Sequence, residues 1–429
     1  MNRKKKLIAI GIVIIVITSG LLVYRYMLPF STTFHSHYGY PPSYKSILDR
    51  EGNIYILYMH EGGGMTIGKF TLTGRMLWIN TIEEYINILV QKINRTYQDF
   101  SPLSIAPGSD FTSFTIDKRN ILHIGFANFY FQIDANGSFR VGEVFYSLMN
   151  YTFVSVQAAP DDTIHLNYLL NNSTLIYEIR DVNNTISDKI FFNNTSYCFG
   201  GSGHIVFPES YKNNKTIYLI YPQELTCKNT TKTVVIYKDL YFHLLPLWEL
   251  NIWGGGKSFV YVLLYKEDIV LYNYGTLQMI NYSPTGMERR EIIKSDDLPP
   301  MVGLIEKRFY RRGLRSEEIY RHNNEEVLTG EFGYDNISYF FRIYSVKLDT
   351  LNYTFNDLYV SNKVQYYTGG FVRFYNVSDT LYITYPQGRN EILPNGEVVF
   401  IDYLIFMKIN FLEKRLEKTG EYKYTNIIY

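Results

Sequence analysis

Apolar, aromatic-rich segments alternate with short polar turns along most of the chain. The clearest copies are Asp49 to Ile56, Asp117 to Ile124 and Asp161 to Leu166, where a polar turn leads into an apolar run. Short runs rich in Ile, Tyr, Val and Phe and bounded by Asp, Asn or Gly are typical of β-strands. We therefore expect an all-β structure from about residue 44 onward.

The turn and strand recur at an interval that suits one four-stranded sheet. Taking the first apolar residue of each copy as a marker, the intervals are about 43 to 77 residues, and the markers are Ile54, Ile121, Ile164, Ile217, Val260, Ile337 and Leu381. A second recurring feature is a hairpin turn that ends in glycine, at Gly74, Gly137, Gly286 and Gly396. In Asn171-Asn172 and Asn183-Asn184, asparagine fills that role, because it tolerates positive φ.

The two longest intervals contain segments of a different kind. From Ile82 to Tyr97, apolar residues recur at spacings of three and four, which predicts an amphipathic helix. A charged stretch extends from Pro299 to Leu328. We interpret both as insertions, at about 82–105 and 299–330.

Asp49 to Ile56, followed by Ile67 to Trp78, resembles the NHL-like and PQQ-like repeats of β-propellers. The resemblance implies an all-β propeller over residues 44–429, with about seven blades, although six or eight also suit the rhythm. Such repeats cannot bury their faces alone and are stable when packed radially. The alternative is a pair of β-sandwich domains divided near residues 230–250.

The N-terminus has the pattern of a membrane anchor. Four basic residues, Arg3 to Lys6, precede an uncharged apolar run from Leu7 to Val23, which is about 26 Å long as a helix. Small residues suited to signal-peptide cleavage are missing just after the run. The charge bias predicts a cytoplasmic stub (1–6), a transmembrane anchor (7–23), a stalk (24–43) and an extracellular remainder.

Sequons for N-glycosylation support an exterior location. Chance predicts about four Asn-x-Ser/Thr triplets in such a chain. The chain has 14, and they begin at Asn94, Asn136, Asn150, Asn171, Asn172, Asn183, Asn193, Asn194, Asn214, Asn229, Asn281, Asn336, Asn352 and Asn376. Overlapping pairs cannot both be occupied, and Pro284 disfavours Asn281. The alternative reading is that Asn and Thr are simply turn and strand residues.

The two cysteines, Cys198 and Cys227, suit one disulfide in an exterior protein, and two buried free thiols are the alternative. Dense sequons, few cysteines and frequent Tyr and Ile resemble the glycosylated cell-surface proteins of archaea.

Composition and charge narrow the range of functions. The chain is 46% hydrophobic and 17% aromatic, which excludes disorder, and its net charge of +1 disfavours a nucleic-acid partner. Catalytic and cofactor motifs are missing: Gly200 to His204 departs from a hydrolase elbow, and no phosphate-binding loop or zinc motif occurs. We expect no cofactor and no metal site. His123 and His165 occupy similar places in their strands, and we expect both in the core.

These patterns predict a single-pass protein of the cell membrane with an extracellular, N-glycosylated propeller. We expect it to act as an interaction or structural module, not as an enzyme, with a cell-surface protein or carbohydrate as a partner. Two alternatives stay open. One is an anchored exterior hydrolase or lyase with its site at the propeller mouth, and the other is an accessory subunit of a membrane complex.

Overall fold

The computed structural model describes residues 44–59, 65–92, 112–145, 154–171, 174–193, 204–208, 211–221 and 233–246, and from 261 to 424 the strands of three further sheets. Pro41–Tyr429 form one compact unit. The described part is almost entirely β-structure, arranged as seven sheets of four strands each. The prediction of an all-β chain is therefore confirmed.

The first four sheets contain the best-described side chains. Their strands are β1 (Tyr44–Leu48), β2 (Asn53–Met59), β3 (Met65–Thr71), β4 (Met76–Thr81); β5 (Thr112–Ile116), β6 (Leu122–Phe126), β7 (Phe129–Ile133), β8 (Phe139–Val144); β9 (Ser155–Ala158), β10 (Ile164–Asn171), β11 (Thr174–Arg180), β12 (Ile186–Asn193); β13 (His204–Val206), β14 (Thr216–Tyr221), β15 (Thr233–Tyr237) and β16 (Leu240–Pro246). Two short helices accompany them, α2 (Ile82–Lys92) and α3 (Tyr211–Asn214).

The last three sheets follow in chain order. Their strands are β17 (Tyr261–Tyr265), β18 (Asp268–Asn273), β19 (Thr276–Ser283), β20 (Gly286–Ile293); β21 (Tyr320–Arg321), β22 (Glu326–Tyr334), β23 (Tyr339–Lys347), β24 (Phe355–Val364); β25 (Arg373–Val377), β26 (Thr380–Ile392), β27 (Val398–Asn410) and β28 (Arg415–Tyr424).

Six of the seven sheets are simple antiparallel meanders in which each strand pairs with the next. The fourth sheet differs, because its order is β13-β14-β16-β15 and β16 runs parallel to β14. The strand β15 takes the outer edge and returns through a tight turn to β16. The last strand of this sheet along the chain, β16, therefore runs in the same direction as its second strand, β14. The same holds for the last and second strands of the other six sheets.

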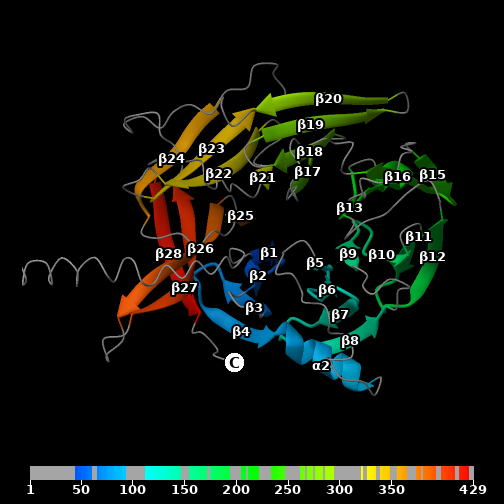
Figure 1. The fold of residues 1–429 in the computed structure, drawn as a ribbon, viewed down its shortest axis with the longest axis horizontal. Coiled ribbons are helices and arrows are strands. Elements are labelled where there is room, and N and C mark those ends of the chain that lie inside the picture. Colours follow the sequence, from blue (N-terminus) through cyan, green and yellow to red (C-terminus); the bar gives the residue numbers. More distant parts are fainter. Residues whose placement is uncertain are drawn as a thin grey trace, which may run out of the picture. The chain divides into compact units, whose positions relative to one another are not determined.

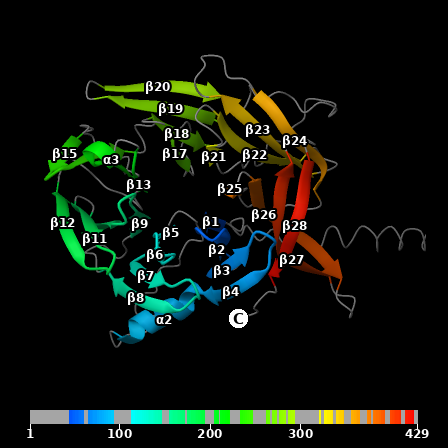
Figure 2. The same ribbon diagram turned by 180° about the vertical axis from the view of Figure 1, so that it is seen from behind.

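Within Pro41–Tyr429, the sheets follow one another around a common middle, with the first strand of each sheet innermost (Figures 1 and 2). The last strand lies at the rim in six sheets, and β15 takes that place in the fourth. Burial follows the same order. The middle strands β3, β6, β7 and β11 are buried on both faces, whereas the outer strands β4, β8 and β12 consist mostly of half-buried and exposed residues. Continuous apolar runs, without polar alternation, therefore belong to strands with a neighbouring sheet on each side.

Hydrophobic clusters join consecutive sheets. Separate clusters connect the first sheet to the second, the second to the third and the third to the fourth. A further cluster connects the first sheet to the seventh, since Ile54, Tyr58 and Phe70 pack with Leu404 and Phe406. The two ends of the repeat array are thus in contact, which suits the propeller predicted from the sequence.

One four-residue turn recurs six times in the first three sheets. In each copy, the first residue accepts a hydrogen bond from the N–H three residues later and donates to the carbonyl four residues later. The residue at the fourth position has positive φ, and these residues are Gly52, Gly74, Asn120, Gly137, Asp162 and Asn184. The prediction for Asn183-Asn184 is confirmed, because Asn184 takes the left-handed conformation.

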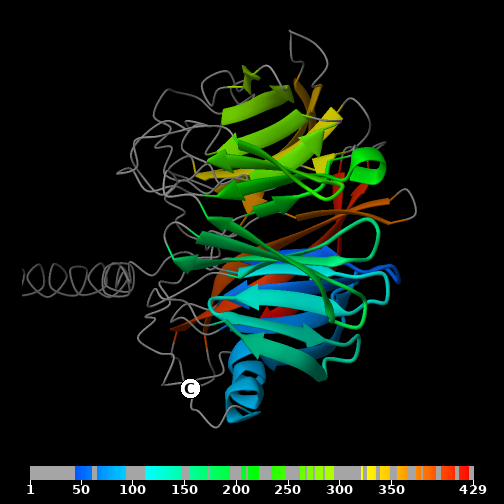
Figure 3. The same cartoon turned by 90° about the vertical axis from the view of Figure 1, so that its right-hand side faces the viewer.

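The predicted helix begins at Ile82 and is described as far as Lys92. It lies at the edge of the unit, and its apolar face packs into the cluster of the first two sheets (Figures 1 and 3). The sequence markers fall on or directly before the second strand in five sheets. Val260 instead precedes the first strand of the fifth sheet, and Ile337 follows the second strand of the sixth. The reason is that a polar turn can precede any strand of a sheet. β21 and the start of β22 fall within the range predicted as the second insertion, and they belong to the sixth sheet.

Several predictions lie outside the described residues. They include the anchor from Leu7 to Val23, the stalk, Cys198 and Cys227. Within the residues that are described, no helix is long and apolar enough to span a bilayer.

Candidate functional site

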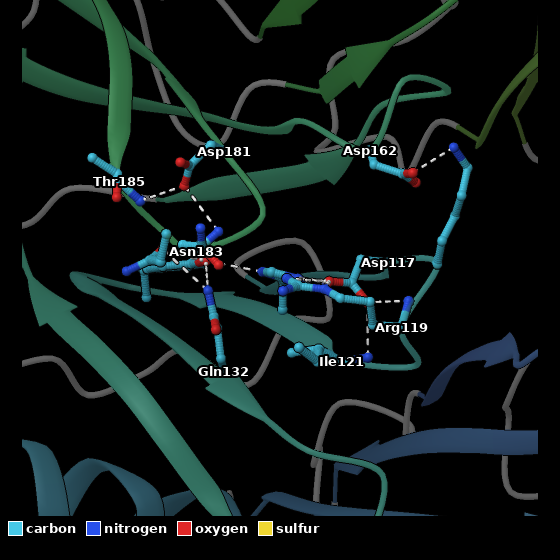
Figure 4. A network of polar contacts seen from close by, with 12 residues as sticks. Asp117, Arg119, Ile121, Gln132, Asp162, Asp181, Asn183 and Thr185 are labelled. Carbon is cyan, nitrogen blue, oxygen red and sulfur yellow. Dashed lines mark hydrogen bonds and ion pairs between the residues drawn. The ribbon is translucent and has the colours of Figure 1, made fainter.

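A polar network lies between the second and third sheets, at the end that carries the repeated turns (Figure 4). Asp117 opens the turn between β5 and β6. Its Oδ1 accepts the backbone N–H groups of Arg119 (2.8 Å) and Ile121 (2.9 Å), and its Oδ2 accepts from Arg119 Nη2 (2.8 Å). Burial opposes ionisation, but the hydrogen bonds from His123, Ile121 and Arg119 lower the pKa of Asp117, so the carboxylate is charged.

His123 connects this carboxylate to β7. The His123 side chain is fully buried, with Nε2 3.4 Å from Asp117 Oδ2 and Nδ1 2.9 Å from the Tyr130 hydroxyl. An ionised carboxylate only accepts hydrogen bonds, so Nε2 carries the proton and Nδ1 is an acceptor. The one proton of the Tyr130 hydroxyl faces two acceptors, His123 Nδ1 and Asn184 Oδ1 (3.0 Å). Desolvation lowers the pKa of His123 in spite of Asp117, which keeps the imidazole neutral.

The network then crosses to the third sheet. Gln132 Nε2 donates to the Tyr130 oxygen (2.8 Å) and to Asn184 Oδ1 (3.1 Å). Asn184 is the positive-φ residue of the turn between β11 and β12. The equivalent glycine of the second sheet, Gly137, lies against Trp78 of the first sheet. Each of these turns therefore contacts the preceding sheet at a corresponding place.

Buried charges extend the network. Arg180 Nη2 donates to Glu178 Oε2 (2.6 Å) on the same strand and to Glu143 Oε2 (2.7 Å) on β8 of the preceding sheet. Lys189 Nζ lies 2.8 Å from Glu178 Oε1. Sequence reasoning missed this group. The signal was present, because Glu178 and Arg180 stand two apart in an apolar strand and so share one face.

The third sheet has a related arrangement. His165 Nδ1 lies 2.6 Å from the Tyr177 hydroxyl and Nε2 2.7 Å from Thr163 Oγ1. Burial lowers the pKa of His165 to about 3. Asp161 accepts from Lys215 Nζ (2.6 Å) near the fourth sheet. The prediction that both histidines are core residues is confirmed.

This geometry supports structural contacts and offers no accessible reactive group. Both ring nitrogens of His123 are engaged and the ring is closed to solvent, whereas a general acid or base must reach a substrate atom. Asp134 forms a hairpin turn, as predicted, since its Oδ1 accepts from Asn136 and Ser138. The part of the chain that the structure describes has no group of three His, Cys, Asp or Glu suited to a metal ion.

The sequon asparagines whose side chains are described lie toward the surface. Asn136, Asn183, Asn193 and Asn214 are exposed and Asn171 is half-buried. Asparagines outside sequons are less exposed. Among those with described side chains, Asn167 is buried, Asn87 and Asn213 are exposed, and the rest are half-buried, namely Asn53, Asn80, Asn120, Asn128 and Asn184. Asn281 and Asn376 lie on β19 and β25. The other sequons fall outside the described residues, namely Asn94, Asn150, Asn172, Asn194, Asn229, Asn336 and Asn352.

Comparison with known proteins does not place the chain in a family. No family model and no curated protein matches it. Among solved structures, a mitotic checkpoint complex is similar over 73% of this chain and 80% of the other, with 10% identity and a TM-score of 0.37. The catalytic domain of a Coprinopsis cinerea GH62 α-L-arabinofuranosidase is similar over 70% and 84%, with 13% identity and a TM-score of 0.29.

A Bacteroides caccae protein of unknown function is similar over 41% of this chain, with 12% identity and a TM-score of 0.26. The chain spans 54% of that protein's length. Similarities at this level carry no argument about function.

Proposed function

We propose that this chain is a membrane-anchored, N-glycosylated protein of the cell exterior, and that its seven sheets are blades of a β-propeller acting as an interaction or structural module. The helix from Leu7 to Val23 attaches it to the membrane. Its partners are N-linked glycans and a cell-surface protein or carbohydrate. It needs no cofactor for this role.

The placement of the sequon asparagines carries the proposal. Four of the five with described side chains are exposed, and Asn136 and Asn183 occupy the same third position of the repeated turn in consecutive sheets. A glycan on an exposed turn is solvated and leaves the sheet contacts intact. If Asn and Thr were only strand and turn formers, sequon asparagines would be covered as often as the others.

The propeller assignment is supported by the contact between the first and seventh sheets. The polar network supports an interaction role in preference to a catalytic one. The side chains of Asp117, His123 and Arg180 all form hydrogen bonds within or between sheets. Loops and outer strands remain for recognition of a partner.

Mass spectrometry of glycopeptides from native membranes tests the exterior location. We expect glycan on peptides that contain Asn136, Asn183 and Asn214. Asn214→Gln should remove one glycan, whereas Asn213→Gln, a change at the exposed neighbouring residue outside any sequon, should remove none. Unmodified asparagine at all three positions would contradict the proposed topology. Protease treatment of intact cells provides a second measurement, because an exterior domain is degraded without lysis.

A further inference from the structure

Asn167 carries a buried carboxamide that the surrounding protein leaves without hydrogen bonds. The residue lies on β10, the second strand of the third sheet, and is 1% exposed. Among the described residues, neither its Nδ2 nor its Oδ1 has a hydrogen-bond partner. Burial of an amide without partners is costly, and most buried polar side chains in folded proteins bond either to protein or to ordered water. Asn167 therefore indicates a polar partner that is not a protein group.

The register of the third sheet gives the surroundings of this amide. Asn167 is paired with Ser155 on β9 and with Tyr177 on β11. Directly paired residues point to the same face of a sheet, with their Cβ atoms about 5 Å apart. Ser155 is buried as well. The amide thus lies beside the Ser155 hydroxyl without a direct hydrogen bond to it, which is the kind of separation that a bridging water fills.

This face of the third sheet packs against the fourth sheet. Tyr177 belongs to the hydrophobic cluster that joins the two sheets, and so does Leu169, two residues after Asn167. The fourth sheet contributes apolar side chains to this cluster, Ile205 and Ile217 among them. These side chains offer the amide no polar atom, and the interface closes it off from bulk solvent. A molecule bound to the amide is therefore small and enclosed.

The second sheet shows how protein groups alone can bond a carboxamide at such an interface. Tyr130 and Tyr177 have the same role, since each hydroxyl lies beside Nδ1 of the histidine on the preceding strand, at 2.9 and 2.6 Å. Gln132, two residues after Tyr130, donates to the Tyr130 oxygen and to the third sheet. The residue two after Tyr177 is Ile179, and the carboxamide instead stands across from Tyr177, as Asn167. From that place it bonds to no group of the described residues.

We propose that Asn167 binds one ordered water molecule, enclosed between the third and fourth sheets. The water accepts a hydrogen bond from Nδ2 and donates one to Oδ1, and its second proton goes to Ser155 Oγ. Buried waters typically make about three hydrogen bonds to groups that the protein leaves unsatisfied. A serine hydroxyl has one donor and two acceptor positions, so Ser155 can bind the water together with another partner. This site needs neither a membrane nor a glycan and goes beyond the proposed function.

A crystal structure of the full-length chain in detergent tests the site directly. We expect an ordered water within about 3.2 Å of Asn167 Nδ2, Asn167 Oδ1 and Ser155 Oγ. A direct hydrogen bond from the amide to a protein group would overturn the proposal. So would an amide that has no ordered solvent within about 3.5 Å.

Relaxation dispersion of the water oxygen-17 nucleus provides a second measurement, because it counts water molecules that a protein holds for long periods. Asn167→Leu should lower the count by one. Leucine has a similar size without polar atoms, and Leu57 holds the corresponding place in the first sheet, across from Ile67. Asn213→Leu is the control, because Asn213 is exposed and lies outside any sequon, and it should leave the count unchanged.

An equal count in Asn167→Leu and the unmodified protein would contradict the proposal. The crystallographic result needs no variant, so it decides the question even if Asn167→Leu does not fold.

Discussion

The Cα atom of Gly420, in the last strand of the seventh sheet, faces the backbone carbonyl of Thr73 in the first sheet. A Cβ atom built on Gly420 would lie 1.8 Å from the Thr73 carbonyl oxygen. The Thr419 hydroxyl donates to the Leu72 carbonyl (2.9 Å) beside it. The first and last sheets therefore meet backbone to backbone at the turn between β3 and β4. The equivalent turn of the second sheet contacts Trp78.

Gly420→Ala should destabilise the protein by about 2 kcal/mol, because the methyl group forces the two sheets apart. Denaturant unfolding of the purified chain measures the effect. Thr73→Ala is the control, since it alters an exposed side chain and keeps the carbonyl, and it should change stability by less than about 0.5 kcal/mol. Equal stability of Gly420→Ala and the unmodified protein would show that the ring does not close at this contact.

Asp117→Ala should lower the free energy of unfolding by about 3 kcal/mol, because buried N–H groups and the Arg119 side chain lose their acceptor. Asp134→Ala is a matched change in the same kind of turn. Among the described residues, Asp134 Oδ1 accepts from two backbone N–H groups near the surface, so its loss should cost about 1 kcal/mol. The comparison fails to support the network if both variants unfold at the same denaturant concentration.

Arg180→Met should cost about 3 kcal/mol or more, because Glu178 remains buried with one partner fewer. The double variant Arg180→Met with Glu178→Met should recover part of that loss, since no buried charge is left unpaired. A double-mutant cycle in denaturant measures the coupling. Additive effects of the two changes would mean that the ion pair contributes nothing beyond its separate parts.

Acid should destabilise the protein through its buried imidazoles. The folded-state pKa of His165 is about 3, below the usual value of 6.5, so the unfolded chain binds the proton more tightly. The stability that neutral His165 provides is present above pH 6.5 and is lost as the pH falls from there to about 3. The slope is at most about 1.4 kcal/mol per pH unit.

Unfolding free energies measured at several pH values test this slope. His165→Gln should flatten it between pH 6 and 4, while lowering stability at pH 7 through the lost contact with Tyr177. His37→Gln, in the segment predicted to be a stalk, should leave the slope unchanged. An unaltered slope in His165→Gln would assign the acid sensitivity to other groups.

Local patterns were enough to predict the second strand of each of the first three sheets and the turns of these sheets. The runs at Asn53–Met59 and Leu122–Phe126 are strands because β-branched and aromatic residues stand between turn formers. The turns at Gly137 and Asn184 follow from residues that accept positive φ. The core role of His123 and His165 was also predictable, since each stands inside an apolar run.

Other features depended on residues that are distant in sequence. Asn184 accepts a hydrogen bond from Gln132, 52 residues earlier, and nothing in either segment of the sequence predicts this contact. The exchange of β15 and β16 in the fourth sheet also lies beyond local pattern, because both are short, mainly apolar strands that suit either position. A polar turn in the sequence indicates a hairpin but does not identify the two strands that it joins. The markers at Val260 and Ile337 are displaced for this reason.

The amino-acid sequence by itself determined that the chain is all-β, where the second strand begins in five of the sheets and which asparagines suit glycosylation, because these properties depend on neighbouring residues. Only the tertiary structure decided which sheets touch, that Gly420 meets Thr73, and that Arg180, paired with Glu178 on its own strand, also pairs with Glu143 across a sheet boundary. Burial and charge pairing arise from the packing of distant segments, and local propensity carries no record of that packing.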